Sequence, residues 1–221
     1  MYSVAQRSDT QVYDEPLYGY YLENTDANEY HPDADLIMKS MECNGRKVVD
    51  MMLGAHNKPV VFFKNMTHHL LDLDRTFLKQ GVNIILTRDP REMLPSFHKV
   101  IPNPGMKDVG YQAHWELIEY FQDNQIEFIV LESSRILKDP ESSLKDLCKN
   151  AGIGFSPSML SWPEGPRPED GVWSKHWYSS IHHSTGFKPH QVKRDVFPEE
   201  LEPLLKECLP IFDRIMEFST L

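Results

Sequence analysis

Arg88 and Ser96 have side-chain types and a spacing that could form an anion-binding site. Arg88 follows the apolar run Val82–Leu86, whose β-branched residues are typical of a buried parallel strand. Asp89 and Pro90 suit a helix start, so Ser96 should lie about two turns into that helix. Arginine is well shaped to grip a phosphate through two hydrogen bonds. The segment therefore predicts either a phosphate site or, as the alternative, a capped strand-to-helix turn with an ordinary surface arginine.

Lys64 is a second candidate, because it closes the apolar run that begins at Pro59. A lysine at the end of a buried strand should point into the same carboxyl-end crevice as Arg88, where open α/β sheets bind ligands. His68 and His69 follow it closely. A histidine near its ordinary pKa can accept a proton at neutral pH, although a histidine on such a turn is more often structural.

These residues must be positioned by alternating strands and helices. Apolar runs predict strands at 10–13, 59–64, 82–86 and 127–131. Periodic segments predict helices at 34–53, from 65 to about 79, from 90 onward, at 108–124, at 140–151 and from 198 to about 218. The first of these helices should be broken near Asn44-Gly45. Asp139 is expected to cap the helix at 140–151. This alternation is typical of a three-layer α/β fold with a parallel sheet. Residues 155–197 read as irregular.

Three motifs resemble sulfotransferases, which use 3′-phosphoadenosine 5′-phosphosulfate (PAPS) as donor. Arg-x-Pro followed by Ser, from Arg88 to Ser96, is similar to their 3′-phosphate-binding segment. Asp-Glu-Pro at 14–16 resembles an element after the second strand in a subgroup of sulfotransferase-like proteins. The run Gly-Pro-Arg-Pro-Glu-Asp-Gly-x-Trp at 165–173, with His-Trp-Tyr and Ser-Thr-Gly-Phe after it, resembles the same subgroup. The motifs cover nearly the whole chain in the family's order.

The resemblance implies a fold of the P-loop NTPase/sulfotransferase type with a helical C-terminal part. It implies one domain over 1–221, with an α/β core at 1–154, an irregular lid or acceptor segment at 155–197 and a C-terminal helix at 198–218. The family's first strand and 5′-phosphosulfate loop have no counterpart in the sequence. We therefore expect either a partial product or gene model, or a sheet that has closed up, since each orphaned buried backbone group costs about 1–3 kcal/mol.

Site roles follow from the same resemblance. Arg88 and Ser96 are expected on the 3′-phosphate, and Lys64 near the transferring sulfate. In the family a histidine just after the lysine removes the acceptor's proton. The familiar Lys-x-His spacing would place it at Met66, so the candidates are His68 and His69.

The segment 170–187 resembles, more loosely, the flexible family segment that closes over the donor nucleotide. By that analogy Gly171, Trp173 and Lys175 could cover the nucleotide, with the aromatic ring stacking on adenine or lining the acceptor pocket. The alternative is that the tryptophans are packing anchors for a loop without a core of its own, which is the interpretation we favour for Trp162.

Composition and charge limit the classes of ligand and the cellular locations that the sequence predicts. A net charge of −10 and a pI near 5.4 argue against a nucleic-acid binder. Cys43, Cys148 and Cys208 are few and widely spaced, which favours reduced thiols and a cytoplasmic location. Neither a transmembrane segment nor a signal peptide is predicted. The adjacent histidines at 68–69 and 182–183 lack ligand-like spacing, so we expect no metal.

The sequence thus predicts a sulfotransferase that moves a sulfuryl group from PAPS to a hydroxyl or amine of a small-molecule acceptor. One alternative is a non-catalytic relative that retains the fold as a nucleotide-binding or interaction protein. A second is a kinase-like phosphotransferase, which Mg²⁺ dependence would distinguish. The acceptor and the oligomeric state are not written in the sequence.

Overall fold

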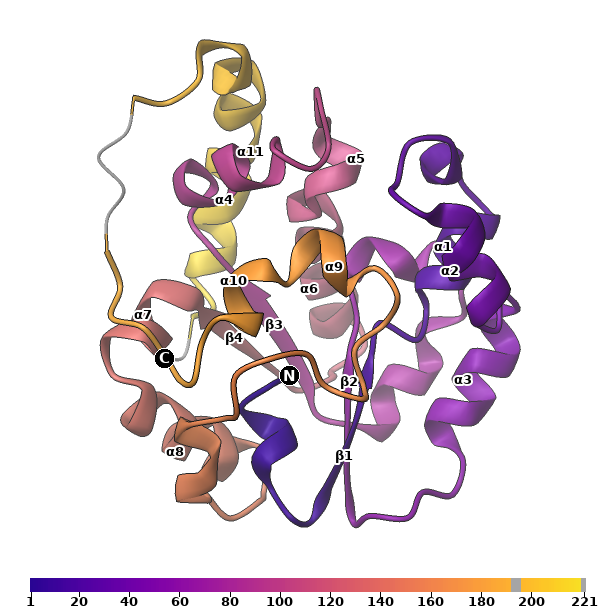
Figure 1. The fold of residues 1–221 in the computed structure, drawn as a ribbon, viewed down its shortest axis with the longest axis vertical. Helices are drawn as coiled ribbons and strands as arrows, with labels where there is room; N and C mark the ends of the chain where they lie inside the picture. The colour runs from indigo at the N-terminus through magenta and orange to yellow at the C-terminus, as the bar shows by residue number, and fades with distance from the viewer. Residues whose placement is uncertain (192–195, 220–221) are drawn as a thin grey trace. The chain divides into compact units, whose positions relative to one another are not determined.

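The computed structural model describes residues 1–191 and 196–219 (Figure 1). The chain divides into two compact units. Unit 1 consists of Met1–Phe77 and Ser156–Phe187, and unit 2 consists of Leu78–Phe155 and Lys188–Leu221. Each unit contains one pair of parallel strands.

In unit 1, strand β1 (Thr10–Asp14) pairs in parallel with β2 (Val60–Lys64), and Asp14 lies opposite Lys64. The segment between these strands forms α1 (Tyr18–Glu23), a 3₁₀ helix (Asp26–Glu29), α2 (Ala34–Ser40) and α3 (Gly45–Leu53). Asn44 caps α3 by accepting a hydrogen bond from the backbone N–H of Lys47 at 3.1 Å. The predicted break near Asn44-Gly45 is confirmed.

The predicted helix from 65 to about 79 is wrong. The segment instead forms two 3₁₀ helices, Thr67–Leu70 and Arg75–Gln80. Leu71 between them has a φ of +42°, which no α-helix accommodates. The Asp74 carboxylate accepts a hydrogen bond from the Thr76 backbone N–H at 2.9 Å, so a local side-chain bond starts the second segment in place of a continuous helical ladder.

The second stretch of unit 1 is mostly irregular, as predicted for 155–197. It carries a 3₁₀ helix (Pro157–Leu160) and two single-turn helices, α9 (Ser174–Trp177) and α10 (Ser179–His182). Trp173 from this stretch packs in the core of unit 1 against a buried cluster from the first stretch, which includes Tyr18, Leu22 and Ile37. Residues 192–195 of the predicted segment lie outside the described part of the chain.

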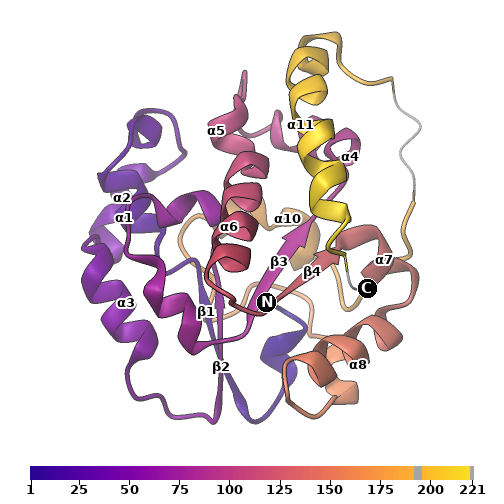
Figure 2. The same ribbon diagram turned by 180° about the vertical axis from the view of Figure 1, so that it is seen from behind.

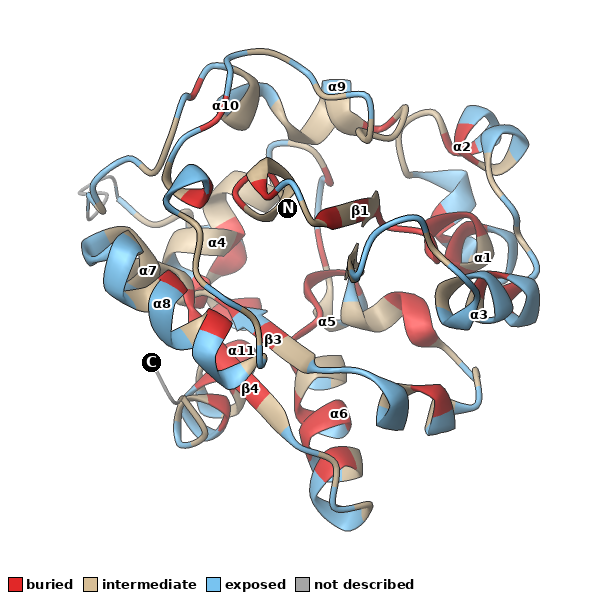
Figure 3. Cartoon of the chain, turned by 90° about the horizontal axis from the view of Figure 1, so that it is seen from below, coloured by how far each residue is buried: buried red, intermediate tan, exposed pale blue. Residues whose placement is uncertain are grey.

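In unit 2, β3 (Asn83–Thr87) pairs in parallel with β4 (Phe128–Glu132). Its helices are α4 (Pro90–Phe97), α5 (Met106–Val109), α6 (Tyr111–Asp123), α7 (Ser133–Lys138), α8 (Pro140–Asn150), a 3₁₀ turn (Glu199–Leu201) and α11 (Glu202–Met216). Helices α6 and α11 pack together beside the two strands (Figure 2). Ile118 and Ile215 from these helices are fully buried, and the buried stripe of α6 is visible in Figure 3.

The predicted helix caps of unit 2 are confirmed. The Asp89 carboxylate accepts a hydrogen bond from the Arg91 backbone N–H at 2.8 Å, and Pro90 occupies the first turn of α4. Asp139 caps α8 by accepting a hydrogen bond from the backbone N–H of Ser142 at 3.1 Å. These caps fix the chain direction as it leaves β3 and as it enters α8.

The predicted α/β class with parallel strands is confirmed. Within the described residues, strand pairing is recorded as β1–β2 and β3–β4. No described helix combines the length and apolar character needed to cross a membrane.

Candidate active site

The carboxyl ends of β1 and β2 bring a lysine and two carboxylates together in unit 1. The parallel register sets Asp14, the last residue of β1, opposite Lys64, the last residue of β2. Glu15 comes next and has a left-handed φ of +46°, and its backbone N–H donates to the Lys64 carbonyl at 2.7 Å. This backbone turn directs the Glu15 carboxylate to the Lys64 ammonium group, with which it forms an ion pair.

Tyr178 lies between α9 and α10 and completes this group. We call the four residues Asp14, Glu15, Lys64 and Tyr178 the Lys64 cluster. Lys64 Nζ lies 3.4 Å from Asp14 Oδ1 and donates to the Tyr178 hydroxyl at 2.7 Å. That hydroxyl in turn donates to Asp14 Oδ1 at 2.8 Å. The carboxylate side chains of Asp14 and Glu15 are 0% and 9% exposed, and the Lys64 side chain is 28% exposed.

Electrostatics keep Lys64 charged. Burial disfavours its ammonium form, but the Glu15 and Asp14 carboxylates beside it outweigh that penalty and raise the pKa of Lys64 above its ordinary value. Burial likewise raises the pKa of the Tyr178 hydroxyl, which therefore stays a neutral donor. A buried cation held in place next to a neutral phenol can stabilise negative charge that develops on a nearby group.

His68 and His69 lie on the 3₁₀ helix that follows β2, within an aromatic cluster. The His69 ring stacks on Tyr18 and Tyr21, with centroid distances of 4.9 and 4.6 Å, and is 1% exposed. Burial lowers the pKa of His69 well below its usual value, and electrostatic repulsion from nearby groups, including Lys64, acts in the same direction. His69 therefore faces inward. His68 is half-buried and packs edge-on against Tyr21.

Arg88 lies directly after β3 in unit 2, as predicted, and its side chain is 38% exposed. Its Nε and Nη2 atoms both donate to Glu92 Oε2, at 3.3 and 3.2 Å, one turn along α4. Its backbone carbonyl accepts a hydrogen bond from the Tyr111 hydroxyl at 2.8 Å. Glu92 thus uses the Nε/Nη2 edge of the guanidinium, and the remaining N–H donors are the two of Nη1 and the second of Nη2.

Ser96 lies two turns into α4, on the same helix that Asp89 and Pro90 begin. Its hydroxyl donates to the Met93 carbonyl at 2.8 Å. A phosphate at this position would have to replace the Met93 carbonyl as the acceptor of that proton. The structure thus places Arg88 and Ser96 in one unit and Lys64 with the two histidines in the other.

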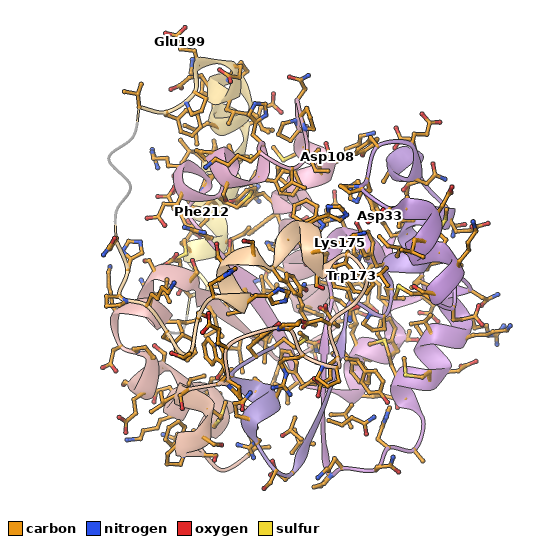
Figure 4. All side chains as sticks on the ribbon, viewed as in Figure 1. Asp33, Asp108, Trp173, Lys175, Glu199 and Phe212 are labelled. Carbon is orange, nitrogen blue, oxygen red and sulfur yellow. The ribbon has the colours of Figure 1, made fainter. Side chains whose placement is uncertain are left out.

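Gly171, Trp173 and Lys175 all belong to unit 1. Trp173 is 3% exposed in the core cluster, and its ring fills the space next to Gly171, where an added Cβ would lie 2.1 Å from the ring. Lys175 forms an ion pair with Asp33 at 2.6 Å (Figure 4). Trp162 is buried and its indole N–H donates to Ser184 at 3.1 Å, so it is a packing residue, in line with the interpretation favoured for it.

His182 and His183 have separate partners. His182 Nε2 lies 3.0 Å from Asp170 Oδ2, which also accepts a hydrogen bond from the Tyr2 hydroxyl at 2.5 Å. His183 Nδ1 lies 2.7 Å from the Ser179 carbonyl oxygen. Across the described residues, no group of three or more His, Cys, Asp or Glu side chains is arranged to hold a metal ion.

Sequence reasoning assigned no chemical role to Glu15 or Tyr178. The available signal was Asp14-Glu15-Pro16 directly after an apolar strand, since parallel neighbours end at the same edge. That signal could have paired these carboxylates with Lys64. Tyr178 gave no comparable signal, because it lies 114 residues from Lys64 in an irregular segment.

A comparison with models of protein families identifies one family. The model of the sulfotransferase domain matches residues 1–217. Two curated relatives from Arabidopsis thaliana, branched-chain-amino-acid aminotransferase-like proteins 1 and 2, are 38% and 37% identical over 218 residues. These matches cover 96% of this chain and 38% of either relative, so the chain spans well under half of their length.

A search of solved structures finds a sulfotransferase domain from the curacin biosynthetic pathway, with a TM-score of 0.43 and 15% identity. The match covers 86% of this chain and 77% of that domain. The family is shown by the match over residues 1–217, which spans almost the entire sequence. This chain therefore belongs to the sulfotransferase-domain family and is, at the family level, a transferase.

Proposed function

We propose that this chain transfers a sulfuryl group from PAPS to a hydroxyl or amine of a small-molecule acceptor. The observation that carries the proposal is the family match over residues 1–217, which includes a lysine and an arginine at the carboxyl ends of two strands. The carboxyl ends of parallel strands are where α/β folds bind their ligands.

The 3′-phosphate of the donor would bind Arg88 and Ser96. The Nη1/Nη2 edge of the guanidinium, which Glu92 does not use, offers parallel N–H donors that suit a phosphate. Ser96 would contribute its hydroxyl after exchanging the Met93 carbonyl for a phosphate oxygen. Gly171, Trp173 and Lys175 remain proposed contacts of the nucleotide; for Trp173 this requires that its ring leave the core cluster or present only an edge.

When bound, PAPS supplies the sulfuryl group. In the reaction, the acceptor's oxygen or nitrogen forms a bond to sulfur, the bond between sulfur and the 5′-phosphate oxygen breaks, and adenosine 3′,5′-bisphosphate leaves. Lys64 would stabilise the charge that develops on the transferring group, because its ammonium is kept protonated. Tyr178 would hold Lys64 in position through the 2.7 Å hydrogen bond.

A base must take the acceptor's proton. Of the two predicted histidines, His68 is the more accessible, since His69 is 1% exposed and stacked on Tyr18. Glu15 is a further candidate base, because burial raises the pKa of its carboxyl group even though Lys64 opposes that shift. A pH–rate profile of Glu15→Gln beside one of His68→Gln would separate these two assignments.

The first test is calorimetric titration of the full chain with adenosine 3′,5′-bisphosphate. Arg88→Ala should weaken binding by about 10- to 100-fold, which corresponds to the loss of hydrogen bonds to a charged group. Arg91→Ala is the matched control: Arg91 lies in the first turn of α4, three residues after Arg88, its side chain is 58% exposed and its removal changes the net charge equally. A non-catalytic relative would show the binding without sulfuryl transfer. No binding by the folded chain would overturn the proposal.

A further inference from the structure

Glu92 links the candidate phosphate-binding arginine to a histidine far away in the sequence. Its Oε2 atom accepts both hydrogen bonds from Arg88, and its Oε1 atom lies 2.8 Å from His190 Nε2. Ninety-eight residues separate Glu92 from His190, and all three residues belong to unit 2. We call this arrangement the Arg88–Glu92–His190 triad.

Burial within the triad increases from Arg88 through Glu92 to His190. The Arg88 side chain is 38% exposed, whereas those of Glu92 and His190 are 15% and 11% exposed. The guanidinium is therefore more accessible to solvent than the two groups that hold it. A long side chain that is fixed on one edge and accessible on the other has already lost much of its rotamer freedom before a ligand arrives.

A carboxylate next to a phosphate-binding arginine can act in two opposite ways. By charge alone, Glu92 would repel a phosphate and weaken its binding. By orientation, it would strengthen binding, because Arg88 would not have to be immobilised when the phosphate arrives. The geometry favours orientation: both guanidinium bonds converge on a single oxygen and use only the Nε/Nη2 edge, and the second oxygen is occupied by His190.

We propose that Glu92 and His190 are positioning residues that preorganise Arg88 for the 3′-phosphate of the donor nucleotide. The inference rests on the proposed function, since it assumes that Arg88 binds that phosphate. His190 acts through Glu92: it fixes the carboxylate, and the carboxylate fixes the guanidinium. The segment Lys188–Gln191 is thereby tied to the donor site through one side chain.

The test compares two nucleotides by calorimetry on the full chain. Adenosine 3′,5′-bisphosphate carries the 3′-phosphate, and AMP lacks it. Glu92→Ala should weaken binding of the bisphosphate by about 2- to 10-fold, the cost of immobilising one rotamer-rich side chain. Binding of AMP should not change. His190→Ala should have the same selective effect, because it leaves Glu92 unanchored.

Conservative variants supply the matched controls. In Glu92→Gln the amide oxygen can still accept from Arg88, and the amide N–H can donate to the other tautomer of His190. This variant retains the orientation without the charge, so it should bind the bisphosphate at least as tightly as the wild type. In His190→Gln a side-chain amide N–H still reaches Glu92, and binding should recover relative to His190→Ala. Thermal unfolding of every variant reports whether the fold is intact.

Three outcomes would contradict either the role of Glu92 and His190 or the nucleotide site itself. If Glu92→Ala and Glu92→Gln both tighten binding of the bisphosphate, Glu92 competes with the ligand and the inference is wrong. If Arg88→Ala weakens bisphosphate binding but neither Glu92→Ala nor His190→Ala does so, the inference also fails, while the proposed nucleotide site stands. If Arg88→Ala leaves the difference between bisphosphate and AMP unchanged, the proposed function itself fails at this site.

Discussion

Replacing Lys64 with methionine tests whether the Lys64 cluster depends on its cation. Methionine retains most of the side-chain volume but removes the positive charge that pairs with Asp14 and Glu15. Both carboxylates are almost completely buried, so their desolvation would no longer be offset. Removal of one partner of a buried ion pair typically costs about 3–5 kcal/mol. Because water reaches the lysine, whose side chain is 28% exposed, we expect a loss of about 3 kcal/mol.

The double variant Lys64→Met/Glu15→Gln isolates the pair. Glutamine at position 15 removes one of the two buried carboxylate charges that Lys64→Met leaves unpaired by a cation. The other carboxylate, that of Asp14, still accepts a hydrogen bond from the Tyr178 hydroxyl. The double variant should therefore be more stable than Lys64→Met alone, and the coupling energy between the two sites should exceed about 1 kcal/mol. Additivity of the two substitutions would refute the ion-pair account.

Urea denaturation followed by tryptophan fluorescence can report on unit 1. Trp162, Trp173 and Trp177 belong to this unit, and Trp115 belongs to unit 2. Measuring each variant in a Trp115→Phe background removes the tryptophan fluorescence of unit 2. A loss of less than about 1 kcal/mol for Lys64→Met would contradict the reasoning, since it would match an ordinary surface substitution.

The pH dependence of Lys64→Met has a defined sign. Without the cation, the pKa of the buried Glu15 carboxyl rises further above its unfolded value of about 4.3. A group with a raised folded pKa contributes stability below the unfolded pKa and loses it as pH rises toward the folded pKa. The deficit of the variant should therefore be smaller at pH 4 than at pH 7. In the wild type, the raised pKa of Lys64 keeps its contribution intact up to about pH 10.4, provided that the pH is high enough for Glu15 and Asp14 to be ionised.

Three further predictions concern other parts of the chain. Gly171→Ala should destabilise unit 1 by about 1–3 kcal/mol in urea titration, because the new Cβ overlaps the buried Trp173 ring; wild-type stability would show that the ring can move aside. Asp139→Ala should cost about 1 kcal/mol through loss of the cap of α8, and Asp139→Asn should restore most of it. Burial lowers the pKa of His114 to about 4, so acidification from pH 6.5 to 4 should cost about 2–3 kcal/mol as the unfolded state takes up the proton; His114→Gln should remove that component, and an unchanged acid profile would count against it.

The strands and helix caps were predictable because their signals are local. Apolar runs predicted strands β1 to β4 to within a residue or two, and Asp89 and Asp139 marked helix starts by their own chemistry. The segment after β2 defied prediction because its apolar spacing also fits two short turns. The left-handed backbone conformation of Leu71 breaks the helix between the two turns. Leucine rarely adopts this conformation, so its presence in the sequence does not predict it.

The candidate site was only partly predictable. Arg88 and Lys64 could be found because each follows an apolar strand directly. Their partners could not all be found, since His190 and Tyr178 lie 98 and 114 residues away from the groups they contact. Such long-range contacts depend on tertiary packing, for which periodicity and spacing carry no signal.

The two-stretch composition of unit 1 has a consequence for how the protein is made. Its first stretch ends at Phe77, but the tryptophan that fills its core, Trp173, belongs to the stretch Ser156–Phe187. On a ribosome that adds about 5–20 residues per second, the first stretch waits roughly 5–20 s before Phe187 is synthesised. During that interval, the aromatic side chains of α1 have no tryptophan to cover them. We expect a chaperone to bind the nascent chain at this incomplete hydrophobic core. A circular permutant that joins the two stretches directly would shorten the delay between their synthesis.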